Sequence, residues 1–449
     1  MKKLFVSVGL VALGTASLYA DDYAPGLGPM QTTKLWSVSG TLRGFYDSNY
    51  ATAPNTKGSY GFEVSPEVQL SMPLQQTELG LRYIYGLYYY TERENLGQDP
   101  IDQSHELDLW LDHAFTERWQ ATAEDTAVVG QEPQLLQAGT PFRVDGNNLA
   151  NVANFSLTTQ WTKLLSSVLT YQNSFYDFEN HGAGINDVLP PGFPFFGTGK
   201  GASLAGLLNR DDNTVGLNLD WQLTPETIGI IGGSFEQDYY LGNEPIAYSP
   251  LLGVQTGNPL YYSRARDART YTGYLGVQQY LLQNLYFSVN AGAQYTDDYN
   301  DPLYSADWAP YVTLSLVYTY LPGSYAQIGF NQTRSATDIV TPTQSTLVTG
   351  KLGSMTADQE NSVVFATINQ EITPKLMATV IGNVQYGVFE GGAYDSMAET
   401  WYSLGVNLAY TFTEHFSADA GYNYDNLQSN IPGYAYVRNR VYLGATVTY

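Results

Sequence analysis

Apolar and polar side chains take alternate positions along many segments of this sequence, and this alternation limits the possible folds more than any other feature. Between Tyr60 and Leu74 the even-numbered positions are apolar, whereas the odd-numbered positions carry mostly Gly, Ser, Glu and Gln. The same split recurs in 285–296 and 402–412. A period of two places successive side chains on opposite faces of a β-strand. The pattern therefore predicts strands with one apolar and one polar face.

About eighteen such segments of roughly 12–16 residues cover the sequence, each longer than the 9–11 residues or so that a tilted transmembrane strand needs. Because the alternation is weak in three of them, 118–129, 163–177 and 324–336, the count could be two strands out either way. The predicted strands are 34–48, 59–74, 77–92, 103–116, 118–129, 147–161, 163–177, 212–223, 226–239, 267–281, 284–297, 308–321, 324–336, 359–372, 375–389, 399–413, 415–426 and 435–449.

The connections between these strands are of two kinds. Short turns join every second pair, and the connections between them are longer and rich in Asp, Asn, Gly and Pro, above all at about 178–211, 240–266 and 337–358. Outer-membrane barrels have short periplasmic turns and long extracellular loops. The chain is therefore predicted to be all-β, with one transmembrane antiparallel β-barrel of about 18 strands over 34–449 and both termini in the periplasm.

The first twenty residues have the features of a secretory signal. Lys2 and Lys3 precede an apolar run from Leu4 to Leu13, and Ala20 is a small residue at a plausible cleavage point. The alternative is a short membrane anchor, but the run is shorter than the 17 or so residues that span a bilayer. We predict a signal peptide over 1–20 and a short periplasmic lead-in over 21–33.

Composition supports a barrel between lipid and water. The chain has 38 Tyr and 43 Gly, and only 14% of its residues are charged, whereas a soluble domain carries about 25%. Because neutralising phosphates requires clustered Lys and Arg, the net charge of -23 excludes an electrostatic nucleic-acid binder. The chain has no Cys, and its sequence shows no spacing typical of a metal site, a phosphate loop or a catalytic nucleophile. We expect no enzyme, no cofactor and no metal.

Charged side chains on the polar faces are expected to line the lumen, since Arg on the lipid face costs about 2–4 kcal/mol. Pairing across the turn after the second strand places Arg82 opposite Gln69 and diagonal to Glu67. Counting from the periplasmic rim makes Arg43 and Arg440 neighbours at the closing seam. The predicted lumen charges are Arg43, Glu63, Glu67, Arg82, Glu106, Asp108, Asp112, Asp419 and Arg440. They form either a salt-bridge ladder that stiffens the seam or a selectivity band along a permeation path.

Aromatic side chains share the inward-facing parity. The predicted lumen aromatics include Tyr88, Trp110, Tyr274, Trp401 and Tyr442. Such rings stack on sugars in a pore, but they equally fill a narrow lumen or ring the membrane interfaces. A sugar path is therefore one of three interpretations.

The last strand ends with apolar residues at every second position before a terminal aromatic. Leu443, Val447 and Tyr449 carry this pattern. It resembles the C-terminal signal that the outer-membrane assembly machinery binds, although Phe is the commoner last residue. The alternative is an ordinary strand that happens to be last.

Three N-terminal segments together resemble a known family. Gly40–Asn49, Ser59–Pro66 and the Tyr-rich Leu81–Tyr90 are similar to the outer-membrane porin family called β-barrel porin-2, over roughly a quarter of the chain. The resemblance implies a porin-type barrel and, from the usual neighbours of the family, a link to exopolysaccharide systems. It carries over no functional residues.

The leading functional hypothesis is a passive diffusion pore for small hydrophilic solutes in the outer membrane, because barrels of this size usually enclose a channel. One alternative is an export conduit or accessory for exopolysaccharide. The other is a surface receptor or adhesion barrel that acts through its acidic loops. Expected partners are outer-membrane lipid, the assembly machinery, and small solutes or polysaccharide. The sequence does not determine the oligomeric state.

Overall fold

The structure is a computed structural model that describes residues 35–50, 57–96, 99–130, 148–179, 204–248, 259–301, 303, 305–337, 356, 358–431 and 435–449. The predicted signal peptide, the predicted lead-in and the central parts of the three longest loops lie outside the described residues.

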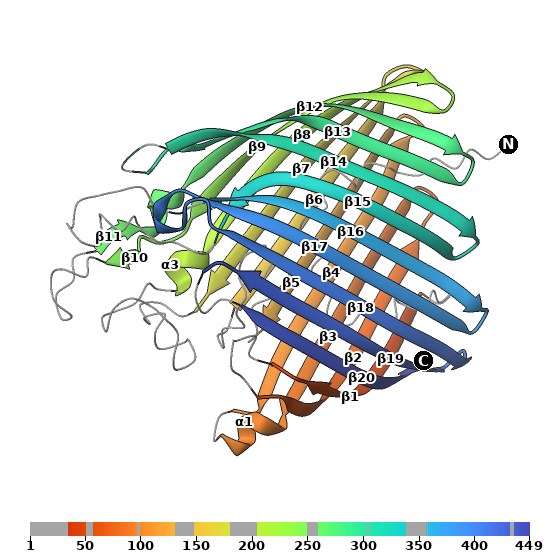
Figure 1. Cartoon of the computed structure of the whole chain (residues 1–449). Helices are drawn as coiled ribbons and strands as arrows, with labels where there is room; N and C mark the ends of the chain where they lie inside the picture. Colours follow the sequence, from red (N-terminus) through yellow and green to blue (C-terminus); the bar gives the residue numbers. More distant parts are fainter. Residues whose placement is uncertain are drawn as a thin grey trace.

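Eighteen strands pair as neighbours around a closed antiparallel barrel (Figure 1). β1 (Trp36–Asp47) pairs with β2 (Ser59–Pro73) on one side and with β20 (Tyr436–Thr448) on the other, which closes the sheet. The other barrel strands are β3 (Thr77–Tyr90), β4 (Ile101–Thr116), β5 (Trp119–Gly130), β6 (Asn148–Gln160), β7 (Leu165–Phe178), β8 (Arg210–Thr224), β9 (Thr227–Tyr240), β12 (Ala268–Leu282), β13 (Leu285–Asp298), β14 (Ser305–Leu321), β15 (Ser324–Ala336), β16 (Asp358–Thr373), β17 (Leu376–Glu390), β18 (Ala398–Thr413) and β19 (Phe416–Ser429). The predicted fold is confirmed, and each predicted segment overlaps one of these strands.

The two ends of the barrel differ. At one end, the short-turn rim, connections of two to four residues such as 117–118 and 161–164 join the strands, and Tyr449 exchanges main-chain hydrogen bonds with Val38 there. The other end, the long-loop rim, carries the remaining elements (Figure 1). These are α1 (Thr91–Asn95), α3 (Leu204–Leu208), β10 (Pro245–Tyr248), β11 (Pro259–Tyr262), η2 (Ser263–Arg266) and η3 (Gly392–Tyr394). Within the described part of the chain, no helix is long and apolar enough to cross a membrane.

The two faces of the wall differ in chemistry, as the alternation predicts. Outward side chains are apolar and exposed, with Leu42, Leu275 and Leu443 at 60%, 66% and 67% exposure, whereas most buried side chains of the wall are polar and face the lumen. Aromatic pairs mark both ends of the outer face, Trp119 with Trp161 near the short turns and Tyr295 with Trp308 near the long loops. Two aromatic girdles around an apolar band are typical of a transmembrane barrel.

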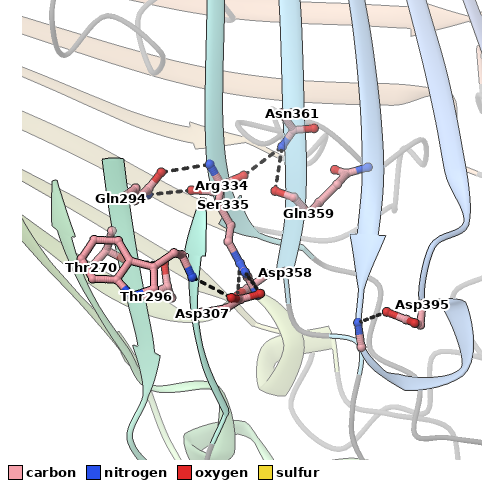
Figure 2. A network of polar contacts seen from close by, with 12 residues as sticks. Thr270, Gln294, Thr296, Asp307, Arg334, Ser335, Asp358, Gln359, Asn361 and Asp395 are labelled. Atoms are coloured by element: carbon pink, nitrogen blue, oxygen red, sulfur yellow. Dashed lines mark hydrogen bonds and ion pairs between the residues drawn. The ribbon is translucent and has the colours of Figure 1, made fainter. Parts of the chain in front are cut away.

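The hydrogen-bonded ladder of the wall is interrupted between β14 and β15. Main-chain pairing of these strands stops at Val312 and Gln332, whereas β15 continues to pair with β16 as far as Ala336. Pro310 lies just beyond the stop and has no N–H to donate. The side-chain amide of Gln294, from β13, replaces the missing main-chain pairing (Figure 2). Its Nε2 donates to the carbonyl of Arg334 at 2.9 Å, and its Oε1 accepts from the Arg334 N–H at 3.0 Å.

Ion pairs also connect the strands at the point where the pairing of β14 with β15 ends. The Arg334 guanidinium contacts Asp358 at 2.9 Å and Asp307 at 3.2 Å, so it joins β14, β15 and β16 where the ladder has ended (Figure 2). Arg266, at the end of η2, adds a hydrogen bond to the Thr337 carbonyl and another to the Leu207 carbonyl at 2.7 Å. Side chains therefore fasten the end of β15 to the elements around it.

Gln294→Ala should destabilise the barrel by about 1–3 kcal/mol, because it leaves a partly buried main-chain N–H and C=O without their side-chain partner. Chemical denaturation of the detergent-folded protein measures this loss. Gln327→Ala is the matched control, since Gln327 lies where β14 and β15 are still paired and donates only to the Ser315 hydroxyl among the described residues. Equal losses in the two variants would contradict the bracing role of Gln294.

Candidate functional site: the charged inner wall

The closing seam, where β1 meets β20, holds a buried network of ion pairs. Arg43 contacts Glu63 on β2 at 3.1 Å and Asp419 on β19 at 3.0 Å, and all three side chains are almost fully buried. Asp419 lies two strands away from Arg43, and Gly444 of β20 is the residue opposite both. A Cβ at Gly444 would come within 2.5 Å of the Asp419 carboxylate and 3.2 Å of Arg43 Nε. A glycine is therefore what allows Arg43 to reach across the seam.

The prediction that Arg43 and Arg440 are neighbours on adjacent strands is wrong, because the two strands pair in a different register. Arg43 lies opposite Gly444, and Arg440 lies opposite Asp47, four residues further toward the long-loop rim. Counting residues from the rim ignores the stagger that strands acquire when a tilted sheet closes into a barrel. The two guanidinium groups nevertheless meet at one carboxylate, because Arg440 reaches Glu63 at 3.8 Å.

A second network lies on β3 and β4 and is more open to the lumen. Arg82 is opposite Gln69, in the register expected from the sequence. Its guanidinium contacts Asp108 at 2.7 Å and Glu106 at 3.2 Å, and its side chain stays 26% exposed. Arg82 is thus paired with β4 rather than with Glu67, its expected diagonal neighbour on β2. The Thr126 hydroxyl donates a further hydrogen bond to Asp108 at 2.8 Å.

Three inward-facing acids near the short-turn rim have no compensating cation among the residues that the structure describes. Glu78 lies directly opposite Asp112, and Glu124 is one strand further on, opposite Trp110. Among the described residues, no Lys or Arg nitrogen lies within 4.0 Å of these carboxylates. Like charges placed opposite each other destabilise a sheet, so this acidic group (Glu78, Asp112 and Glu124) opposes stability rather than supporting it. Sequence reasoning included only Asp112.

Several ion pairs were not predicted at all. Arg438 pairs with Asp47 in a completely buried contact, with its Nε donating at 2.9 Å. Arg438 has the same parity as Arg440, which is a signal that the sequence offered. The pair of Arg210 with Asp212 at 2.7 Å was missed because Arg210 lies outside the predicted strand 212–223. The partners of Arg334 were missed because its segment alternates weakly.

Three of the predicted lumen aromatics lie over glycines of the neighbouring strand. Trp110 is opposite Gly80, Tyr274 is opposite Gly232, and each ring occupies the space of the missing side chain. Tyr442 lies over Gly421 in the same way, and the Arg43 guanidinium covers its ring at 4.9 Å. The face of Tyr442 is therefore already occupied.

The other two predicted aromatics also belong to the wall. Tyr88 packs against a buried cluster formed by Phe45, Tyr50, Tyr90 and Tyr442. Trp401 lies between Gln385 of β17 and Leu427 of β19 and is partly buried.

The last strand presents its apolar residues outward. Leu443 and Val447 are 67% and 58% exposed, and the Tyr449 ring lies 5.9 Å from that of Trp36. This arrangement leaves a row of apolar side chains along the strand that closes the barrel. Their role as an assembly signal stays a prediction.

Comparison with known proteins yields one family match. The family described as "Putative beta-barrel porin 2" matches residues 334–449. This is the family that the N-terminal segments resemble, and the match covers the last quarter of the chain rather than those segments. The predicted outer-membrane location and porin-type barrel agree with this family. A search of the curated proteins finds no relative.

Solved structures of outer-membrane proteins are also similar to this chain. OccK3 of Pseudomonas aeruginosa is 12% identical, with 92% of this chain and 96% of that chain covered and a TM-score of 0.40. OccAB4 of Acinetobacter baumannii is 13% identical, with 94% and 100% covered and a TM-score of 0.40. OccK1 of Pseudomonas aeruginosa is 10% identical, with 92% and 99% covered and a TM-score of 0.43.

Gly444→Val should weaken the folded barrel by about 1–3 kcal/mol, because a branched side chain does not fit beneath the pair of Arg43 and Asp419. Gly44→Val is the control, since a Cβ at Gly44 has no atom within 4 Å. Denaturant midpoints of the two variants in detergent provide the comparison. If Gly44→Val lost as much stability as Gly444→Val, the role of the glycine at the seam would be wrong.

Proposed function

We propose that this chain is a passive diffusion pore of the outer membrane for small hydrophilic solutes. One observation carries the proposal: an eighteen-strand closed barrel whose inward wall is polar. Barrels of sixteen to eighteen strands are wide enough to leave an aqueous channel. Partly exposed side chains such as Arg82 face this channel, so the wall is wetted rather than filled.

We further propose that the pore favours cations. The seam network is buried, so we assign Arg43, Glu63 and Asp419 to stiffening the closure. Among the described residues, the Arg82 guanidinium contacts two acids, Asp108 and Glu106. The acidic group of Glu78, Asp112 and Glu124 adds negative charge at the exit toward the short-turn rim. Rings of acidic side chains in a channel attract cations and repel anions.

Purified protein added to one side of a planar lipid bilayer should produce discrete steps of current, because each inserted barrel opens one water-filled path. Protein denatured before addition is the control. Folded, inserted protein that produced no current steps in repeated experiments would contradict the pore.

The triple variant Glu78→Gln, Asp112→Asn and Glu124→Gln should reduce the preference for K⁺ over Cl⁻ several-fold, because it removes three uncompensated charges from the wall. The reversal potential in a KCl gradient measures this ratio. Glu226→Gln with Glu414→Gln is the control, because these acids lie in the short turns outside the lumen. An unchanged reversal potential in the triple variant would refute the assignment of selectivity to this group.

A further inference from the structure

The Asp125 carboxylate lies on the outer face of the wall, opposite apolar side chains on both neighbouring strands. Asp125 of β5 is opposite Leu109 on β4 and Ala153 on β6, both of which face outward. Along β5 the same face carries Ala123 before it and Ala127 after it. Asp125 is six residues from Trp119 of the periplasmic-side girdle, so it lies within the apolar band rather than at its edge.

Lipid cannot satisfy this carboxylate. Asn151, also facing outward on β6, donates to Asp125 Oδ1 at 2.8 Å. Among the described residues, no donor reaches the other oxygen, Oδ2. An acidic side chain facing hydrocarbon is costly, and such residues in membranes usually face protein or water.

The outer surface around Asp125 also carries several small side chains. Ala121, Ala123 and Ala127 on β5 and Ala153 on β6 share its outward face, next to the larger Leu109 and Phe155, whereas Leu217, Leu275 and Leu443 occupy such positions on other strands. Small side chains let two membrane proteins approach closely, and polar groups between them then supply hydrogen bonds.

We propose that a second copy of this chain docks on the outer face of β5, β6 and β7; this inference rests on the membrane position in the proposed function. Ala153 lies opposite Asp125 on one side and Asn173 of β7 on the other. A two-fold axis along the membrane normal beside Ala153 brings β5 of one copy against β7 of its partner. Such a contact is self-complementary.

The facing strand offers hydrogen-bond donors to the carboxylate. Tyr171 of β7, 41% exposed, lies two residues from Asn173 on the same outward face, and its hydroxyl donates to Asn213 within the single copy. Turning this hydroxyl to the carboxylate of the partner replaces a neutral hydrogen bond by a charge-assisted one, which is stronger. The same exchange occurs twice, once on each side of the axis.

A single cysteine tests the geometry, because the natural chain has none. Ala153→Cys in native outer membranes should give a disulfide-linked band of twice the monomer mass after mild oxidation, since the two thiols meet near the axis. Ala420→Cys is the matched control, an outward alanine on β19 opposite Leu408 and Leu443. Absence of the Ala153→Cys dimer, or equal dimer from both variants, would overturn the proposal.

A second variant tests the chemistry. Asp125→Leu should change the particle mass in mild detergent from dimer to monomer, as measured by light scattering. Retained heat-modifiable migration on gels would show that the variant barrel is folded. A monomeric wild type, or a dimer unchanged by Asp125→Leu, would refute the role of this surface. Conductance is measured separately. Loss of conductance would contradict the proposed pore and leave the dimer unaffected, whereas loss of the dimer would leave the proposed pore unaffected.

Discussion

Closure of the main-chain hydrogen-bond ladder is the constraint on which the rest of this structure depends. In lipid no water is available to satisfy a free strand edge, so the first strand must find the last. Here β1 accepts β20 along nine residue pairs, from Ser39 with Thr448 to Asp47 with Arg440. The buried charges of the seam then fix which residues meet. Arg43 with Asp419 across Gly444, and Arg438 with Asp47, are satisfied in this register, and a shift by one residue would turn each charge toward lipid.

Buried and exposed charges have different roles in this barrel, and the same geometry explains the difference. Charges at the seam form ion pairs and are almost inaccessible, so they contribute to the wall. Charges on β3, β4 and β5 remain accessible from the lumen, and the acids there outnumber the bases. A barrel built only for stability has no reason to place Glu78 opposite Asp112. We therefore attribute the first set of charges to the architecture and the second to transport.

The sequence predicted the strands well because alternation is imposed directly by the two solvents on either side of the wall. It predicted the register of Arg82 with Gln69 because a short turn fixes which residues face each other. It failed at Arg43 and Arg440 because β1 and β20 are the ends of the chain, and no turn between them sets the stagger. The pair of Arg334 with Asp358 was missed because the segment of Arg334 alternates weakly, although β15 and β16 are still paired at both residues.

The interruption between β14 and β15 has a mechanical consequence. Elsewhere the circumference is fixed by main-chain bonds, whose number cannot change without unfolding a strand. Where β14 and β15 separate near the long-loop rim, the side chains of Gln294, Arg266 and Arg334 provide the fastening. Rotation of a few side chains is much faster than loss of a strand. The mouth is therefore held at this place by contacts that can rearrange without breaking a main-chain ladder.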